Sequence, residues 1–306
     1  MPRFALIDLP SNLGLRPSGV ERLPDALRRA GLRERLAARD AGRVEPTVAY
    51  DSVRDPKTHL LNGPGLRATS IALSRAVAGV AERREVPVVL AGDCSVVLGA
   101  LLGLRFVARA LGAPDRVGLL FVDGHVDFYQ PSVSPTGEVA DMDLALATGR
   151  GPSVLARFDD IGEGSLVRDE DVAAVGARDA GEREEAGSQD VRATGIRLFE
   201  LDTVRARGVD AVAEDAMTVV ARPDLASFWL HLDADVLDDS VMPAVDYRQP
   251  DGLAPTEMVT LLRVALRSGR LGGVSVAIYN PALDPDGRGA HTLTDCLATG
   301  LTDSPA

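Results

Sequence analysis

Two clusters of acidic residues are the part of this chain best suited to chemistry, because each follows directly on a strongly apolar run. The members are Asp123, His125 and Asp127 in the first cluster, and Asp233 and Asp235 in the second. Such runs are typical of buried parallel strands, so the clusters are expected at the rim of a sheet. Carboxylates crowded there repel one another and lose hydration, and a divalent cation is their natural counter-ion. A single Asp at a strand end is more often a turn former or a helix cap, but two clusters in the same context favour a metal site.

The composition indicates a globular protein and excludes several classes of partner. The 306 residues are 45% hydrophobic and 25% charged, which is sufficient for a substantial core. The net charge of -12 repels nucleic acid and anionic membranes, and no apolar stretch reaches the roughly 18 residues of a membrane span. The two cysteines and the lack of a signal-peptide pattern favour a reducing compartment. We therefore expect a cytoplasmic protein with a small-molecule substrate and no nucleic-acid or membrane partner.

Strand-like and helix-like patterns alternate along most of the chain and predict the scaffold that positions the clusters. The runs expected to be strands are Phe4 to Leu9, Val44 to Tyr50, Val86 to Ala91, Val117 to Val122, Val172 to Gly176, Ile196 to Leu201, Phe228 to Leu232 and Val274 to Tyr279. The expected helices are Gly65 to Arg84, Ser95 to Leu111, Val209 to Val220, Pro255 to Ser268 and Ala290 to Leu301. This alternation predicts a single α/β domain over residues 1–306, a parallel sheet with helices on both faces. Ligands of such folds bind at the carboxyl ends of the strands, where both clusters fall.

A third motif joins the two clusters and carries a family resemblance. It is Ala91-Gly-Asp-Cys94-Ser, and it precedes Asp123-Gly-His125-Val-Asp127 and Asp233-Ala-Asp235-x-x-Asp238. In this order the three motifs resemble G-G-D-H-S, D-A-H-x-D and D-x-D-x-x-D of the ureohydrolase family of arginase, agmatinase and formiminoglutamase. The resemblance implies a three-layer α/β/α sandwich around a parallel sheet of about eight strands, with a binuclear manganese centre at its carboxyl edge. It also implies a hydroxide held at the metal that attacks a carbon–nitrogen bond, and a homo-oligomeric assembly.

The resemblance transfers residue by residue onto this chain. The implied metal ligands are Cys94, Asp123, His125, Asp127, Asp233 and Asp235, and Asp127 is also counted among the catalytic residues. His231 lies two residues before Asp233, so both side chains should share one face of a strand. His231 and Asp238 are expected to support the ligands without touching the metal. The alternatives are a core role for His231 and a turn-forming role for Asp238.

Cys94 departs from the family, which has a histidine ligand at this position. A thiolate is a softer ligand than imidazole, so Zn²⁺ or Fe²⁺ become candidates beside Mn²⁺. The alternative is that Cys94 is a buried small apolar residue at a strand-to-helix junction. A further hypothesis makes Cys94 the nucleophile of a hydrolase, with His125 as its base.

Ala140 is a second departure, because it stands where the family has a proton-carrying histidine. Asp141 or Asp143 is expected to take over the proton transfer, since a carboxylate near a cation-rich site can act as acid or base. The alternative is that both cap the helix that follows.

Ile278 is a third departure, because the family has a glutamate there that pairs with the guanidinium of the substrate. An apolar residue leaves that cation unpaired, which argues against arginine as the substrate. Asn280 and Arg178 are expected to contact the substrate instead, although Arg178 and Asp179 can also form a structural salt bridge.

Together these residues predict a metal-dependent hydrolase that attacks an amidino, formimino or amide carbon–nitrogen bond in a small substrate other than arginine. A non-catalytic metal-binding relative and a hydrolase with Cys94 as nucleophile are the competing hypotheses.

Overall fold

One parallel sheet contains every strand of the described chain. The computed structural model describes residues 2–158 and 164–302. The eight strands of these residues follow the order β2-β1-β3-β8-β7-β4-β5-β6, and each pairs parallel to its neighbours. Their bounds are β1 Arg3–Leu9, β2 Arg39–Arg43, β3 Glu85–Ala91, β4 Gly118–Val122, β5 Val172–Val175, β6 Arg197–Phe199, β7 Phe228–Asp233 and β8 Leu271–Ala277. All residues of β4 and β7 are buried, as expected for strands covered on both faces.

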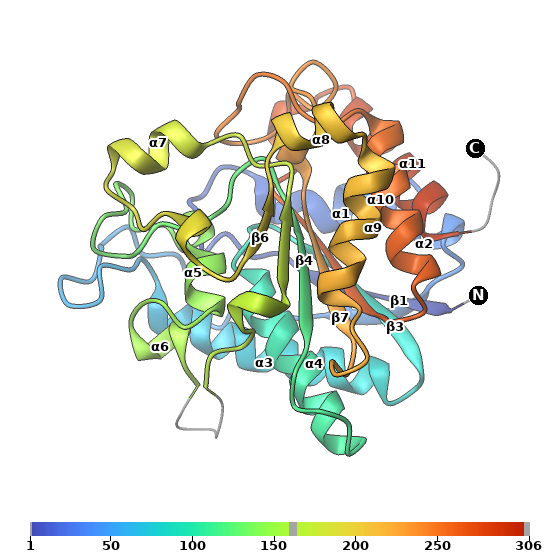
Figure 1. Cartoon of the computed structure of the whole chain (residues 1–306), viewed down its shortest axis with the longest axis horizontal. Coiled ribbons are helices and arrows are strands. Elements are labelled where there is room, and N and C mark those ends of the chain that lie inside the picture. Colours follow the sequence, from blue (N-terminus) through green and yellow to red (C-terminus); the bar gives the residue numbers. More distant parts are fainter. Residues whose placement is uncertain (1, 159–163, 303–306) are drawn as a thin grey trace.

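Helices cover both faces of the sheet and complete three layers (Figure 1). The bounds of the α-helices are α1 Leu23–Arg29, α2 Leu32–Arg35, α3 Gly63–Ala81, α4 Val96–Ala110, α5 Asp143–Ala147, α6 Ser153–Ala156, α7 Ala180–Glu185, α8 Leu201–Arg207, α9 Val209–Val220, α10 Pro255–Arg267 and α11 Arg288–Leu301. Helices α3 and α4 pack on one face, and α9, α10 and α11 on the other. Each face has its own apolar core. The predicted three-layer α/β/α sandwich with a parallel sheet is therefore confirmed.

The prediction of a strand at Val44 to Tyr50 is wrong, because the strand in this region is β2 at Arg39–Arg43. Its sequence, RDAGR, is polar because β2 lies at an edge of the sheet, pairs only with β1 and is partly exposed. An edge strand needs no apolar run, and charged side chains there prevent pairing with other chains. Val44 to Tyr50 contains Pro46, which has no N–H to donate to a neighbouring strand.

No helix among residues 2–158 and 164–302 has the length and apolar character needed to cross a membrane.

Candidate metal centre and its pocket

The six predicted ligands meet at the carboxyl edge of the sheet. They come from the segments that follow β3, β4 and β7, and these strands share one direction. Potential ligand atoms lie within 4.8 Å of one another in four groups of three. The groups are Asp123 with Asp233 and Asp235, Asp123 with His125 and Asp127, Cys94 with Asp127 and Asp143, and Cys94 with Asp123 and His231. The structure thus brings all six together and adds Asp143 and His231 to them.

Tight turns fix the two acidic clusters. Asp123 Oδ1 accepts a hydrogen bond from the backbone N–H of His125 at 2.6 Å, and Asp233 Oδ1 accepts one from Asp235 at 2.7 Å. Asp235 Oδ1 also accepts from the N–H of Gly124 at 3.0 Å, which joins the two loops. In each turn one carboxylate oxygen is used by the backbone. Asp123 Oδ2, the other oxygen, is buried and has no hydrogen-bond partner among the described residues, so it remains available for a cation.

A close backbone contact places Cys94 in the centre. A Cβ on Gly92 would lie 1.8 Å from the carbonyl oxygen of Ser11, so only glycine allows the two segments to touch. Asp93 then accepts hydrogen bonds from the N–H of Gly14 and from Ser95, which holds the turn. Cys94 is buried by this arrangement, and its thiol donates to Asp233 Oδ2 at 2.9 Å.

The electrostatics of the cluster favour a positive partner. Burial, and after it the neighbouring carboxylates, raise the pKa of Asp123, Asp127 and Asp233 well above the usual range. Burial and the nearby Asp233 likewise raise the pKa of the Cys94 thiol. Groups that are held neutral in this way ionise when a divalent cation binds among them. The donor set and the free oxygen of Asp123 therefore fit a metal ion.

Within the set of six predicted ligands, His125 lies closest to Asp235 and farther, at 3.8 Å, from Asp123 Oδ1. His125 Nδ1 and Asp235 Oδ2 are 2.8 Å apart. Burial acts to lower the pKa of His125, but the attraction of Asp235 outweighs it and raises that pKa to about 9. Burial acts to raise the pKa of Asp235, and His125 in turn brings it below the usual value. Without a metal ion, protonated His125 supplies positive charge to the cluster. A bound metal ion would take over that role.

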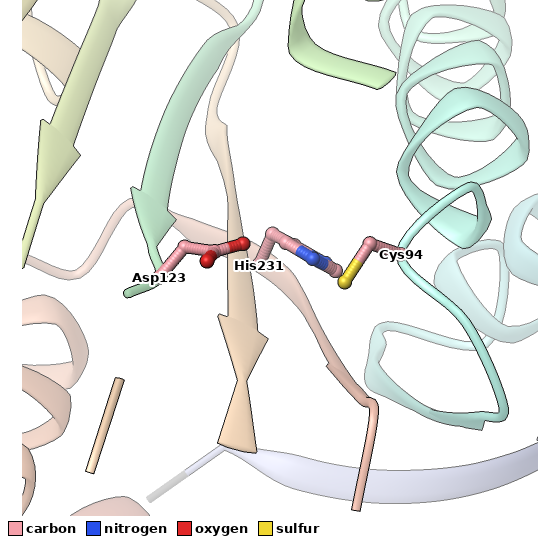
Figure 2. A group of neighbouring side chains, drawn as sticks. All are labelled: Cys94, Asp123 and His231. Carbon is pink, nitrogen blue, oxygen red and sulfur yellow. The ribbon is translucent and has the colours of Figure 1, made fainter. Parts of the chain in front are cut away.

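His231 lies between Asp123 and Cys94, with its ring directed toward the sulfur (Figure 2). It is fully buried on β7, and its ring stacks on Phe121 with 5.0 Å between centroids. Its Nδ1 is 2.8 Å from the hydroxyl oxygen of Ser275, and its Nε2 has no partner among the described residues. Burial lowers the pKa of His231 to about 3, so the ring is neutral and suited to support the ligands.

A pocket of about 130 Å³ opens above the predicted ligands. His125, Asp127, Asp233 and Asp235 form part of its lining, and Ala140 and Ile278 also face it. Further acids lie around the pocket, and they are Glu138, Asp141, Asp179, Glu182 and Asp246. A pocket of this size has room for several water molecules, which suits the polar end of a small molecule.

Asp141 and Asp143 have different surroundings, and neither caps the helix that follows. Asp141 lines the pocket and accepts hydrogen bonds from the hydroxyls of Ser134 at 2.9 Å and Thr136 at 2.6 Å. Burial raises the pKa of Asp141 to about 7 although both hydroxyls act to lower it. Asp143 is the first residue of α5 and lies outside the pocket lining, and neither of its oxygens bonds to the helix backbone.

Ile278 faces the pocket with a strained backbone. Its φ of 70° lies in the left-handed region, which β-branched residues rarely adopt. Strand β8 ends at Ala277, directly before Ile278. The N–H of Ile278 then donates a hydrogen bond to the carbonyl of Gly92 at 2.9 Å. Strain of this kind persists where the surrounding structure enforces it, commonly at functional sites.

The other residues expected near the substrate have protein partners in the structure. Asn280 is buried outside the pocket lining and donates to Asp246, an acid of the pocket, at 3.1 Å. Arg178 donates to the carbonyl of Asp235 at 2.8 Å, and Asp179 pairs with Arg183 rather than with Arg178. These contacts favour positioning roles for Asn280 and Arg178.

Asp238 lies outside the four groups of potential ligands and accepts hydrogen bonds from the N–H and hydroxyl of Ser240, which suits the turn-forming alternative.

Two residues of the pocket lining, Glu138 and Tyr247, were not indicated by any sequence pattern. The hydroxyl of Tyr247 donates to Glu138 Oε2 at 2.7 Å and accepts from Arg16 at 2.9 Å. Tyr247 lies in the irregular segment between β7 and α10, where no periodicity indicates which side chains face inward. Its positive φ of 54° is equally invisible to pattern analysis.

Comparisons with known proteins agree with this architecture. The family model described as the Arginase family matches residues 2–302. The chain is similar to the arginase of Staphylococcus aureus (strain COL), with 25% identity over 300 residues that cover 96% of this chain and 95% of the relative. It is 32% identical to the N(omega)-hydroxy-L-arginine amidinohydrolase of Streptomyces lavendulae over 224 residues, 73% of this chain and 71% of the relative. The solved arginase of Bacillus caldovelox superposes with a TM-score of 0.86 at 26% identity and 99% coverage of both chains. The match to the family model over nearly the whole length shows that this chain belongs to the Arginase family.

Proposed function

We propose that this protein uses a binuclear metal centre, with manganese as the first candidate, to hydrolyse the amidino group of a small modified guanidino compound. Members of the family are hydrolases of carbon–nitrogen bonds other than peptide bonds, and this chain is such a hydrolase. Family enzymes use a binuclear metal site that typically holds Mn²⁺. The observation that supports the metal most strongly is that three buried carboxylates, of Asp127, Asp233 and Asp235, gather around the buried carboxylate of Asp123 in two adjoining groups. Because Cys94 belongs to the same set, Zn²⁺ and Fe²⁺ are the alternatives to Mn²⁺.

The bound metal would supply a water molecule of lowered pKa and would neutralise developing charge. Cys94, Asp123, His125, Asp127, Asp233 and Asp235 would hold it. In this proposal Asp127 takes part in both metal binding and catalysis, because it also lines the pocket. His231 would support these ligands without binding the metal, held in place by its hydrogen bond with Ser275.

Asp141 is the residue that we propose to carry the proton to the leaving amine. It would take the role that the family gives to a histidine at the position of Ala140, because both residues line the same pocket and Asp141 has a pKa of about 7. A group whose pKa lies near the working pH both donates and accepts a proton readily. The bonds from Ser134 and Thr136 fix its orientation.

The pocket favours an N-hydroxylated or otherwise modified guanidino group over arginine itself. Ile278 supplies no carboxylate for a guanidinium, whereas an N-hydroxyguanidine is a weaker base and can bind as a neutral group. The acids around the pocket, including Glu138 and Glu182, repel anionic substrates and attract an amine elsewhere on the molecule. The name of the relative from Streptomyces lavendulae, an N(omega)-hydroxy-L-arginine amidinohydrolase, supports this class of substrate.

The environment of Cys94 argues against its use as a nucleophile. Burial and Asp233 raise the pKa of the thiol, whereas an attacking cysteine needs a lowered pKa. The thiol donates its hydrogen bond to Asp233 and not to His125, the base in that hypothesis. His125 instead forms an ion pair with Asp235.

A substrate panel tests the proposal. Protein reconstituted with Mn²⁺ is assayed with arginine, agmatine, Nω-hydroxyarginine and formiminoglutamate, and release of urea, hydroxyurea or formamide is measured. We expect turnover of the hydroxylated compound that is abolished by a chelator and insensitive to an alkylating agent. Comparable turnover of arginine contradicts the substrate assignment. No turnover of any compound favours the non-catalytic alternative.

A cytoplasmic location and a homo-oligomeric assembly are further proposals. The net charge of -12 supports a small-molecule partner rather than nucleic acid. Light scattering of the purified protein tests the assembly, and a monomer at micromolar concentration contradicts it.

A further inference from the structure

Asp143 is a buried carboxylate that the rest of the protein leaves without a partner. It is fully buried, and neither Oδ1 nor Oδ2 has a hydrogen-bond partner among the described residues. An ionised carboxylate in such a place is unfavourable by roughly several kcal/mol unless a cation compensates it. The helix that it begins offers little such compensation, because the carboxylate makes no capping hydrogen bond to α5.

The side chain of Asp143 faces the metal centre on the side of Cys94. One of its oxygens, the sulfur of Cys94 and a carboxylate oxygen of Asp127 lie within 4.8 Å of one another. The backbone holds this arrangement, because the N–H groups of Leu144 and Ala145 donate to the carbonyl of Asp127 at 3.1 and 3.3 Å. The start of α5 is therefore fixed next to Asp127, and this brings the side chains of Asp143 and Asp127 together.

We propose that Asp143 is an additional ligand of the metal position beside Cys94. This inference rests on the proposed metal-dependent function and specifies the ligands of one of its two positions. The position combines the sulfur of Cys94 with carboxylates of Asp127 and Asp143, where the family resemblance implies a histidine. The oxygen of Asp143 adds a hard ligand to a soft one, so the position retains affinity for Mn²⁺ despite the thiolate.

The location of Asp143 separates this role from proton transfer. Asp141 lines the pocket and is held by two hydroxyls, whereas Asp143 lies outside the lining and has no exposed surface. A proton carrier must reach the substrate, and Asp143 is shielded from the space where the substrate would lie.

The variant Asp143→Asn tests the proposal, since it keeps the shape of the side chain and removes its charge. Asp171→Asn is the matched control, because Asp171 is equally buried but is paired with Arg116 and Arg222. Chelator-treated protein is titrated with Co²⁺, whose thiolate-to-cobalt absorption band reports on the position beside Cys94, and Cys94→Ser shows that the band arises there. Bound Mn²⁺ is counted by elemental analysis, and metal-dependent thermal shifts are recorded.

We expect Asp143→Asn to need at least about tenfold more Co²⁺ to develop the band and to lose close to one Mn²⁺ per chain. Without metal this variant should melt at or above the wild-type temperature, because an uncompensated carboxylate has been removed. Asp171→Asn should be less stable with and without metal and keep its Mn²⁺. Equal Co²⁺ midpoints and Mn²⁺ counts in Asp143→Asn and wild type would overturn the proposal.

Asp235→Asn separates this inference from the proposed function. Metal lost in Asp235→Asn but retained in Asp143→Asn refutes only the role of Asp143. Metal lost in both variants, in a protein that hydrolyses nothing in the substrate panel, refutes the substrate proposal and supports the ligand role.

Discussion

The affinity of this protein for Mn²⁺ should rise steeply with pH, because in the ligand role proposed for it His125 must lose a proton before it binds a cation. Asp235, 2.8 Å away, holds the pKa of His125 at about 9, compared with 6.5 for an unperturbed imidazole. At pH 7 about one His125 ring in a hundred is therefore neutral, and binding is weakened roughly a hundredfold, or about 2.7 kcal/mol. Between pH 7 and pH 8 the affinity should increase about tenfold for this group alone.

The buried carboxylates act in the same direction. The pKa of Asp123, Asp127 and Asp233 is raised by burial, so each carboxyl that is neutral at the start releases its proton when the metal binds. In the protein without metal, a raised pKa contributes stability that is present at low pH and lost as pH rises through the folded value. Metal should therefore stabilise the protein more at pH 8 than at pH 6.5.

Titration calorimetry measures both effects. Mn²⁺ is added to chelator-treated protein between about pH 6.5 and 8, in two buffers that differ in ionisation enthalpy. We expect at least one proton released per ion and a tightening of about tenfold or more per pH unit below pH 9. Asp171→Asn, altered far from the centre, should keep the same slope. An affinity independent of pH, together with heats independent of the buffer, would refute the reasoning.

Three further changes probe the pocket and the Cys94 position. Asp141→Asn should lose turnover while keeping its metal. In wild type the turnover rate should fall as pH rises through about 7, because the protonated, donating form of Asp141 declines; the residual turnover of the variant should lack this fall. Cys94→His should raise Mn²⁺ occupancy towards two ions per chain, whereas unchanged affinity would make Cys94 a packing residue. Ile278→Glu should increase urea release from arginine by about tenfold or more, because it supplies a carboxylate to the pocket; no gain at full metal occupancy would mean that Ile278 does not limit arginine hydrolysis.

The sequence was sufficient to predict the sheet and the convergence of the six proposed ligands at its carboxyl edge, because both follow from local patterns. Buried strands appear as apolar runs, and acids two residues apart at a strand end face the same way. The edge strand β2 was misplaced because its exposed residues are polar.

The ligand role now proposed for Asp143 depends on packing that no local pattern records. The chain reverses at Asp127, whose φ is 49°, and only then do the first residues of α5 reach the carbonyl of Asp127. Glu138 and Tyr247, 109 residues apart, meet through a contact between two irregular segments. Contacts of this kind arise from the tertiary fold and have no sequence period.

The order of the strands has a consequence for how this protein is made. β3 and β4 follow one another along the chain, but β8 and β7, which are synthesised much later, lie between them in the sheet. While the ribosome is still producing the first two hundred or so residues, Cys94 and Asp123 therefore have no scaffold that brings them together. The mutual repulsion of the acids is deferred until residues 228–277 insert. The proposed metal ion should accordingly be captured at the end of folding rather than nucleating it, and a nascent chain released before β7 would lack the proposed centre altogether.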